Sequence, residues 1–219
     1  MKYAKDKLNL EEGTKRDWII TNGLGGYASS TIIGANTRKY HGLLVAPLTP
    51  PARRYLILSK IDESIETNGK KYNLYTNMCK NYISNGYKYL ESFEKDYIPT
   101  FEYKVDGINI KKSICMEYGK NTVVILYKIK NNKNTSKLIL APIMNFRDFH
   151  IVTTDCKFDV RQEINQNKVK VVINGQSATP IYMNLTQGKY IKHDSDQFNN
   201  MYYIEEEKRG LPSEENHAI

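Results

Sequence analysis

Alternation of apolar and polar residues, interrupted by Asn-Gly and Asp-Gly pairs, constrains the fold of this chain more than any other feature. Asn68-Gly69 and Asp106-Gly107 each stand between alternating residues, within segments 61–75 and 101–116. Such pairs accept the positive φ angles of type I′ turns, so both segments are predicted to be β-hairpins. Almost no segment has helical periodicity, which favours a fold built from antiparallel strands.

Several further segments have the composition of strands: Trp18 to Thr21, Gly42 to Ala46, Tyr55 to Ser59, Thr122 to Lys130, Lys137 to Ile143, Lys168 to Ile173 and Ile181 to Leu185. Together with the hairpins they make about ten strands without the spacing of βαβ units, so the fold class is all-β, with a large antiparallel β-sandwich. The 17 tyrosines suit half-buried pleated surfaces, and most are expected to be structural. Only the glutamate-rich segment from Glu205 to Ile219 looks like the exit from the domain.

Length and composition limit the function classes. A chain of 219 residues, 40% hydrophobic, can bury a core as one large domain or two small ones. No apolar run reaches the length of a membrane span, and no apolar stretch follows the charged residues Met1 to Lys7, so neither a membrane segment nor a secretory signal is expected. Cys79, Cys115 and Cys156 lack paired spacing, which indicates a reducing, cytoplasmic compartment.

The net charge of +8 raises the possibility of nucleic-acid binding. That function needs clustered cations, whereas the lysines here are scattered among acids, as in segments 91–95, 102–104 and 205–209. A basic nucleic-acid-binding β-domain therefore stays an alternative of third rank, and we expect no nucleic-acid partner.

A glycine-rich stretch, NGLGGYASSTIIGANTRKYHG, occupies residues 22–42. Residues 23–28 formally satisfy the dinucleotide pattern G-x-G-x-x-G/A, but the β-branched, glycine-stopped residues 29–34 cannot form the helix that would hold a pyrophosphate. A Walker loop also fails, because no Gly-Lys-Ser/Thr follows. The glycines are therefore predicted to serve backbone geometry, through positive φ angles or close approach of another group, in a tight turn.

The side chains around this turn combine amide, hydroxyl, guanidinium and imidazole donors with aromatic faces, a mixture that suits sugar hydroxyls and sugar rings: Asn22, Tyr27, Asn36, Arg38, Tyr40 and His41. The structural alternative is that Arg38 and Tyr40 pack across a sandwich edge and that His41 is a hydrogen-bonded structural histidine. The residues alone leave both interpretations open.

The segment WIITNGLGGYASSTIIGANTRKYHGLLVAP resembles the start of the bacterial and archaeal type of glycogen debranching enzyme, the amylo-α-1,6-glucosidase family. The resemblance continues through residues 119–123, 142–150 and 207–211, and so spans nearly the whole chain. It implies an N-terminal β-supersandwich, galactose mutarotase-like in fold, followed in the family by a C-terminal (α/α)₆ barrel. That barrel hydrolyses the α-1,6-linked glucose at a glycogen branch point. No part of these residues can form it, so residues 1–219 are expected to be a single N-terminal domain.

Glycoside hydrolysis generally needs two carboxyl groups about 5 to 9.5 Å apart. The resemblance places them on the barrel, and this chain alone is expected not to be catalytic. The sequence does not show which of Asp62, Glu63 and Asp148 could act together as a carboxylate pair. Asp62 and Glu63 are adjacent on a strand and are expected to point to opposite faces. Each of the three acids is expected to be solvated at the surface. No Gly-x-Ser-x-Gly elbow exists. Four histidines (His41, His150, His193 and His217) lack metal spacing, so we expect no metal and no cofactor.

Two motifs are predicted to form the functional surface. Residues 22–27, which include Gly23, Gly25 and Gly26, are expected to share one polar edge with residues 36–41. Arg147, Asp148 and His150 follow a predicted strand and are expected to join that edge, although an Arg-Asp pair in one tetrapeptide is often a local structural contact. The resemblance implies that these residues shape the substrate cleft or dock the catalytic domain, with the C-terminal domain and a branched α-glucan as partners. The alternative is a stand-alone carbohydrate-binding β-domain.

Overall fold

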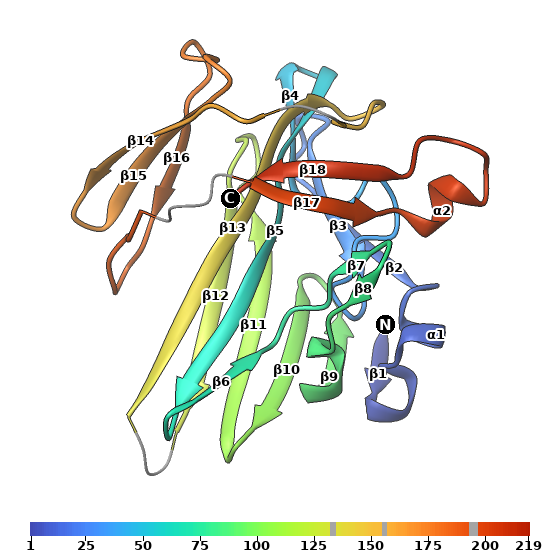
Figure 1. Cartoon of the computed structure of the whole chain (residues 1–219), viewed down its shortest axis with the longest axis vertical. Helices are drawn as coiled ribbons and strands as arrows, with labels where there is room; N and C mark the ends of the chain where they lie inside the picture. Colours follow the sequence, from blue (N-terminus) through green and yellow to red (C-terminus); the bar gives the residue numbers. More distant parts are fainter. Residues whose placement is uncertain (132–134, 155–156, 193–196) are drawn as a thin grey trace.

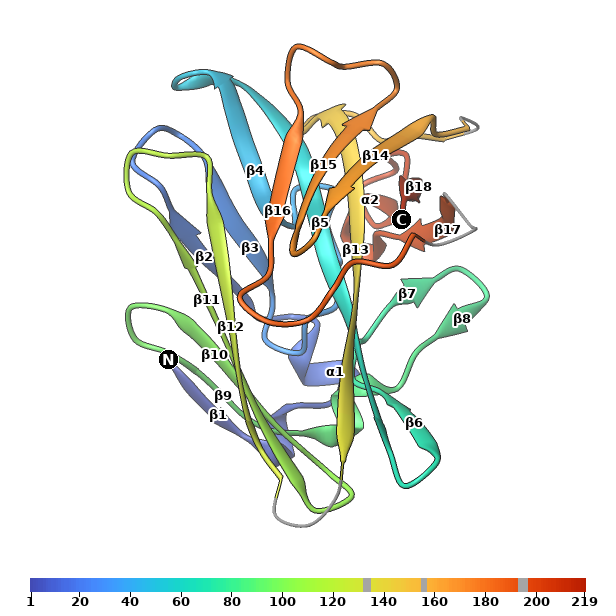
Figure 2. The same ribbon diagram turned by 90° about the vertical axis from the view of Figure 1, so that its left-hand side faces the viewer.

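The computed structural model describes residues 1–131, 135–154, 157–192 and 197–219, and almost all of its regular structure is β-strand. Within these residues the strands form one ten-stranded, one five-stranded and one three-stranded sheet, in which the strand pairs are antiparallel (Figure 1). Figure 2 shows the five-stranded sheet facing the long strands of the large sheet. The predicted all-β sandwich is confirmed.

The ten-stranded sheet is organised around two long neighbouring strands, β5 (Ala52–Thr67) and β13 (Ser136–Asp148). On the side of β5 follow β4 (Gly42–Thr49), β3 (Tyr27–Thr31) and β2 (Asp17–Thr21), and β6 (Lys70–Asn73) also pairs with β5. On the side of β13 follow β18 (Glu214–Ala218), β17 (Gln197–Tyr202), β7 (Met78–Cys79) and β8 (Tyr82–Ile83).

The five-stranded sheet has the order β1 (Lys2–Ala4), β9 (Leu90–Lys95), β10 (Pro99–Val105), β11 (Ile108–Met116), β12 (Val123–Lys130). The small sheet consists of β14 (Val160–Asn165), β15 (Lys168–Ile173) and β16 (Ile181–Asn184). Among the described residues, helical structure is limited to short turns: η1 (Lys5–Lys7), α1 (Leu10–Gly13), η2 (Gly86–Tyr89) and α2 (Ile204–Glu207). In the described part of the chain, no helix has the length and hydropathy needed to cross a membrane.

Both predicted hairpins are present. Asn68 and Gly69 have φ angles of 50° and 71°, and Asp106 and Gly107 have φ angles of 48° and 77°. Positive φ at both central residues is the requirement of a type I′ turn, which explains why these pairs join the strands. The two hairpin tips also meet, because the Asn68 amide donates to the Asp106 carboxylate at 3.1 Å.

The main core lies between the two large sheets. Aromatic rings from both sheets meet there: Trp18 of β2 packs edge-on against Phe101 of β10, and Phe101 packs edge-on against Phe93 of β9. The Trp18 indole N–H donates to the Thr31 carbonyl at 3.1 Å, so its one polar group is satisfied. The inward rows of each strand supply this core, as period-two alternation predicts.

Two expectations from the sequence are wrong. The segment from Glu205 to Ile219 does not simply leave the domain, because β18 lies within the large sheet between β13 and β17. Asp62 and Glu63 are buried instead of solvated. These buried acids have partners. Glu215 of β18 pairs with Arg147, Asp62 accepts a hydrogen bond from Asn77, and Glu63 accepts hydrogen bonds from Lys112 at 2.5 Å and from Tyr127 at 2.7 Å.

Candidate functional site

The glycine-rich segment forms a tight turn between β2 and β3. The Asn22 side-chain oxygen accepts the backbone N–H groups of Leu24 and Gly26, both at 2.9 Å. Gly23 and Gly25 have φ angles of 78° and 93°. A Cβ on Gly25 would lie 2.7 Å from the Pro51 carbonyl oxygen, closer than side-chain carbons come. The prediction that the glycines serve positive φ angles and close approach is confirmed.

The Asn22 amide also ties this turn to the facing sheet. It is fully buried and donates to the Lys120 carbonyl and to the Asn121 side chain, both at 3.0 Å. Gly26 lies against it, since a Cβ there would be 2.7 Å from the Asn22 nitrogen. The hydrogen bonds of Asn22 are therefore all made to groups of the protein, and they fix the turn against residues 120–121.

Asn36 is likewise directed inward. Its side-chain oxygen accepts from the Ser30 hydroxyl at 2.8 Å, and its amide donates to the Ser59 carbonyl at 3.2 Å. Because Ser30 belongs to β3 and Ser59 to β5, Asn36 connects the loop after β3 with the centre of the large sheet. This asparagine positions the loop that carries residues 37–41.

Asp17, Arg38 and His41 form a partly exposed cluster at the start of β2. The Arg38 guanidinium donates to the Asp17 carboxylate at 3.0 Å, and the Nε2 atom of His41 lies 3.4 Å from the other Asp17 oxygen. His41 Nδ1 accepts the Thr37 N–H at 3.1 Å, which places the ring proton on Nε2. Burial opposes ionisation of Asp17, but hydrogen bonds and charge from His41 and Arg38 outweigh it and lower the Asp17 pKa.

The two predicted motifs meet at the end of β13. The Tyr27 hydroxyl donates to the Tyr40 carbonyl at 2.8 Å, and the Arg147 guanidinium donates to the Lys39 carbonyl at 2.7 Å. The Tyr40 hydroxyl lies 3.3 Å from His150 Nδ1. Burial raises the pKa of Tyr27 to about 12, against the charges of Arg147 and Arg54, so this hydroxyl stays a neutral donor. Residues far apart in sequence thus share one edge.

An accessible group of rings lies on this edge, and we name Tyr40, Phe149, His150 and Arg54 the aromatic end cluster. The Tyr40 ring packs edge-on against Phe149 and His150, with centroids 5.6 and 5.8 Å apart. The Arg54 guanidinium lies 5.4 Å from the centre of the Phe149 ring. His150 is exposed and the other three are half-buried. The cluster offers ring faces, a hydroxyl, an imidazole and a guanidinium to a ligand or partner.

Arg147 lies beneath this cluster and is itself only 3% exposed. Its guanidinium makes a two-point ion pair with the Glu215 carboxylate, which also accepts from the Tyr203 hydroxyl. The Glu215 carboxylate accepts the backbone N–H of Thr153 at 3.0 Å as well. Burial opposes ionisation of Glu215, but the charges of His217 and Arg147 and the hydrogen bonds to Arg147 and Tyr203 lower its pKa. Arg147 therefore binds the end of β13 to β18.

Asp148 closes the turn that carries the exposed imidazole. Its carboxylate accepts the backbone N–H of His150 at 2.9 Å. Asp148 and Arg147 make no ion pair with each other, since Arg147 donates to the Asp148 carbonyl and its charge faces Glu215. Of the three site residues predicted from this motif, one is exposed, one is half-buried and one lies in the interior.

The sequence model of the family described as "Glycogen debranching enzyme N terminal" matches residues 16–219 of the chain. The chain belongs to this family. No curated protein and no solved structure matches it. The match begins at the cluster of Asp17, Arg38 and His41 and includes the glycine turn, the aromatic end cluster and β18, so these features all belong to the debranching-enzyme N-terminal region.

Sequence reasoning missed several residues that hold the edge of this debranching-enzyme domain. Asp17, Arg54, Tyr203 and Glu215 contact the predicted motifs but lie outside them. The sequence signal for the charged residues among them was the residue type alone, because an acid or a cation on a buried strand needs a partner. Which partner each one takes depends on strand order, and that order is not readable from spacing.

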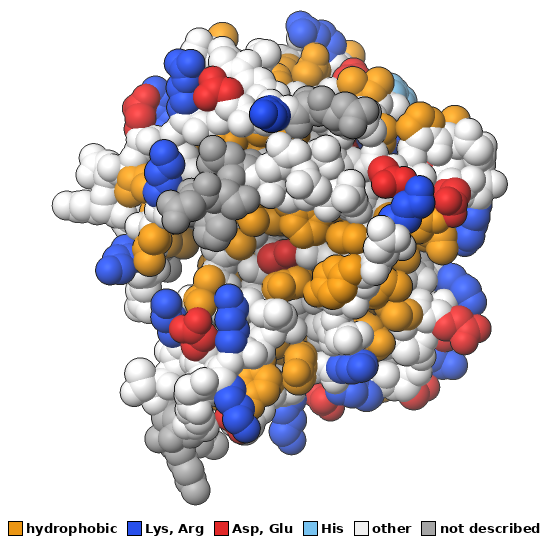
Figure 3. Space-filling model, viewed as in Figure 1, with side chains coloured by type: hydrophobic (Ala, Val, Ile, Leu, Met, Phe, Trp, Pro, Cys, Tyr) orange, Lys and Arg blue, Asp and Glu red, His pale blue; other side chains and the backbone are white. Residues whose placement is uncertain are grey.

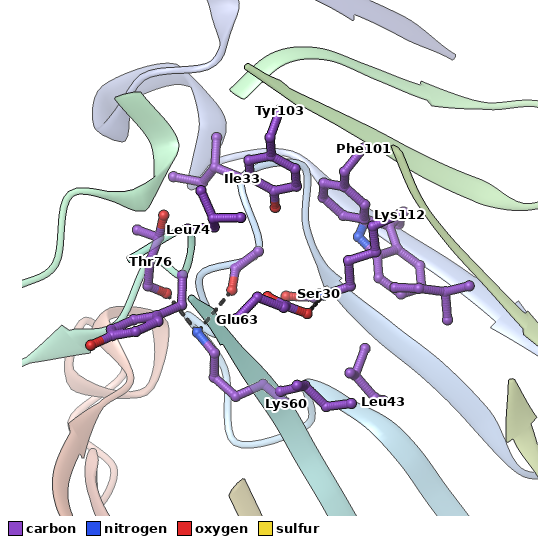
Figure 4. A pocket seen from close by; sticks show the side chains of 15 residues that line it. Ser30, Ile33, Leu43, Lys60, Glu63, Leu74, Thr76, Phe101, Tyr103 and Lys112 are labelled. Atoms are coloured by element: carbon purple, nitrogen blue, oxygen red, sulfur yellow. Dashed lines mark hydrogen bonds and ion pairs between the residues drawn. The ribbon is translucent and has the colours of Figure 1, made fainter. Parts of the chain in front are cut away.

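The interior between the sheets holds a small cavity of about 20 Å³. Its lining includes Ser30, Lys60, Glu63 and Lys112 among apolar side chains, and Lys60 donates to the Gly34 and Thr76 carbonyls at 3.2 and 2.7 Å (Figure 4). This volume has room for about one water molecule and none for a sugar. This cavity is therefore not a glucan site.

Asp62 faces away from that cavity and accepts from the Asn77 amide at 2.6 Å, so the two adjacent acids do point to opposite sides. Among the residues that the structure describes, no three His, Cys, Asp or Glu side chains gather as a metal site. Cys79 and Cys115 are free thiols, whereas Cys156 and His193 lie outside the described residues.

Proposed function

We propose that residues 1–219 are the single N-terminal β-sandwich domain of a glycogen debranching enzyme and that the chemistry belongs to a C-terminal (α/α)₆ domain. In this proposal the chain docks to that domain and shapes its substrate cleft, and so supports hydrolysis of the α-1,6-linked glucose at a branch point. The parent enzyme is a cytoplasmic glycoside hydrolase, which suits the free thiols of Cys79 and Cys115.

The observation that carries the proposal is the aromatic end cluster in a chain of this family. The cluster is assembled from three separate segments, and Arg147, Glu215 and Asn36 fix the backbone beneath and beside it. Accessible rings and donors on a rigid support are the usual construction of a surface that orients a ligand or partner. Tyr40 and His150 are the side chains that we assign to this surface.

The acids of this domain support a non-catalytic role. Glu63 is engaged with Lys112 and Tyr127, and Asp62 with Asn77. Burial raises the pKa of Asp62, but the two carboxylates point to opposite sides and cannot flank one glycosidic bond. We therefore expect the chain alone to release no glucose from branched dextrins.

The test uses the enzyme that contains this domain. Tyr40→Ala should lower kcat/KM for a branched dextrin by about tenfold, and this loss should persist below the melting transition, where the weakened packing against Phe149 and His150 leaves the domain folded. Tyr40→Phe keeps the ring and should retain most activity. Tyr97→Ala, which removes a tyrosine 86% exposed elsewhere, is the matched control and should change neither kcat/KM nor the melting temperature.

Equal losses of kcat/KM in Tyr40→Ala and Tyr97→Ala, or full activity in Tyr40→Ala, would contradict the proposed surface. Glucose release by the 219-residue chain, abolished by replacing one of its own acids, would contradict the assignment of the chemistry to another domain.

A further inference from the structure

The outer face of the small sheet has a regular arrangement that the proposed function does not use. Strand register places Glu163 opposite Lys170 and Lys170 opposite Tyr182, in one row across β14, β15 and β16. The next row consists of Asn165, Lys168 and Asn184. Because side chains alternate along a strand, these six residues share one face.

This face is accessible and hollowed. Tyr182 is 67% exposed, and the six side chains, with Ile164 and Val169, border a broad hollow that is open to solvent. The hollow offers contacts to one side of a ligand and does not enclose it. The three-stranded sheet lies at the upper left of Figure 1, beside β5 and β13.

The opposite face of the same sheet is anchored in the protein. Val169, Val171 and Ile173 of β15 are 3%, 1% and 1% exposed and belong to the main hydrophobic core. One buried face fixes the register of the strands, because a slip of one residue would exchange the two faces. The polar face is therefore presented in a defined geometry.

The chemistry of the face argues against two kinds of occupant. Lys170 forms an ion pair with Glu163 at 2.9 Å, so the carboxylate neutralises the central cation and would repel a phosphate backbone. On the face shown in Figure 3, positive and negative side chains are interspersed over the surface. Lysine and glutamate are also depleted at the centre of protein–protein interfaces, so a partner protein fits poorly.

An uncharged polyhydroxyl ligand fits this arrangement. The Tyr182 ring offers a flat apolar surface, and the row beside it offers two amides and an ammonium group, which donate and accept hydrogen bonds. The Glu163–Lys170 pair supplies an acceptor and a donor that are already held in place. Glycogen, the polymer named in the family to which the chain belongs, has many glucose units that a surface can hold.

We propose that the outer face of β14–β16 binds glucose units of a branched α-glucan, with Tyr182 stacking on a sugar ring and Asn165 and Asn184 hydrogen-bonding its hydroxyls. The glucan identity rests on the proposed function, whereas the site is separate from the aromatic end cluster. Its role is to hold the polymer, and no bond is made or broken there.

The test is retardation of the 219-residue chain in native gels that contain glycogen, with maltoheptaose as a soluble competitor. We expect wild-type retardation that hardly changes between about 50 and 200 mM salt, since the ligand is uncharged. Tyr182→Ala should weaken the apparent affinity by about five- to tenfold. Tyr182→Phe should retain it, and Tyr97→Ala, which also removes an exposed tyrosine, should match the wild type.

No retardation of the wild type, or equal weakening by Tyr182→Ala and Tyr97→Ala, would overturn the site. Binding of an oligonucleotide that falls steeply with salt, without a response to glycogen, would overturn the choice of ligand. If the chain is not retarded by glycogen but Tyr40→Ala lowers kcat/KM of the enzyme, the site on β14–β16 is wrong and the proposed function stands. If Tyr182→Ala weakens retardation but Tyr40→Ala leaves kcat/KM unchanged, the site on β14–β16 stands and the proposed role of the aromatic end cluster is wrong.

Discussion

Two clusters in this domain use the same three side-chain types, an arginine, a carboxylate and a histidine, at very different depths. In the inner cluster, Arg147 and Glu215 are 3% and 1% exposed, and His217 is fully buried. In the outer cluster, the side chains of Arg38 and Asp17 are 37% and 31% exposed, although His41 is buried, so the difference in depth lies in the ion pair. In both, the histidine Nε2 atom lies 3.4 Å from a carboxylate oxygen.

The difference between the clusters is one of solvent, not of chemistry. Water screens the outer ion pair and can solvate either partner if the other is removed. Water does not solvate the inner ion pair in this way, so loss of one partner leaves an unpaired charge buried in the interior. The same chemistry should therefore be indispensable at one depth and dispensable at the other.

The largest effect should come from removing the inner carboxylate. Glu215→Ala leaves Arg147 without its ion pair and is expected to lower the free energy of unfolding by about 3 to 5 kcal/mol. Urea unfolding followed by tryptophan fluorescence measures this, since Trp18 is the only tryptophan. The neighbouring Glu214→Ala, which removes an exposed partner of Lys80, is the control and should cost less than about 1 kcal/mol. Equal losses of unfolding free energy in Glu215→Ala and Glu214→Ala would contradict the contrast between buried and exposed ion pairs.

The second effect is a dependence of stability on pH that the inner histidine should produce. Burial, with the charges of Arg147 and Lys60, lowers the pKa of His217 to about 4, against the opposing charge of Glu215. The unfolded chain takes up a proton near pH 6.5 and the folded chain does not. Stability is therefore full above pH 6.5 and falls as the pH decreases toward about 4, by about 3 kcal/mol in all.

His217→Phe tests this sign. The difference in unfolding free energy between wild type and variant should change across this pH window, because the carboxylates distant from His217 titrate alike in both proteins and cancel. Glu215 is the exception, since its pKa depends in part on His217. A constant difference from pH 7 to pH 4 would show that the buried imidazole takes up its proton in the folded state as easily as in the unfolded one.

The smallest effect should come from the outer arginine. Arg38→Ala removes a half-exposed pair with Asp17 and is expected to lower the free energy of unfolding by less than about 1 kcal/mol. A double-mutant cycle with Asp17→Ala isolates the pair. If the Arg38 guanidinium also contacts glucan in the enzyme, kcat/KM will fall without a change in melting temperature. If Arg38→Ala lost as much unfolding free energy as Glu215→Ala, the exposure of an ion pair would not determine its contribution to stability in this domain.

The elements predicted correctly are those whose signal is local. The turns at Asn68-Gly69 and Asp106-Gly107 follow from backbone preferences, and β15 follows from alternation over residues 168–173. The strand β18 escaped prediction because Glu215 and His217 are polar residues on a buried strand, so its pattern resembles a solvated tail. Only the presence of Arg147 on the neighbouring strand makes that burial possible.

The sequence by itself determined that the chain is all-β, that its glycines form a turn, and that it belongs with glycogen debranching enzymes, because these depend on local φ preferences, period-two alternation and motif identity. Tertiary structure decided which polar residues are accessible. Asn22, Asn36, His41 and Arg147 face inward, whereas Tyr40, His150 and Tyr182 stay within reach of a ligand. The reason is that burial depends on which strands pair and which faces meet, and those contacts join residues more than a hundred positions apart.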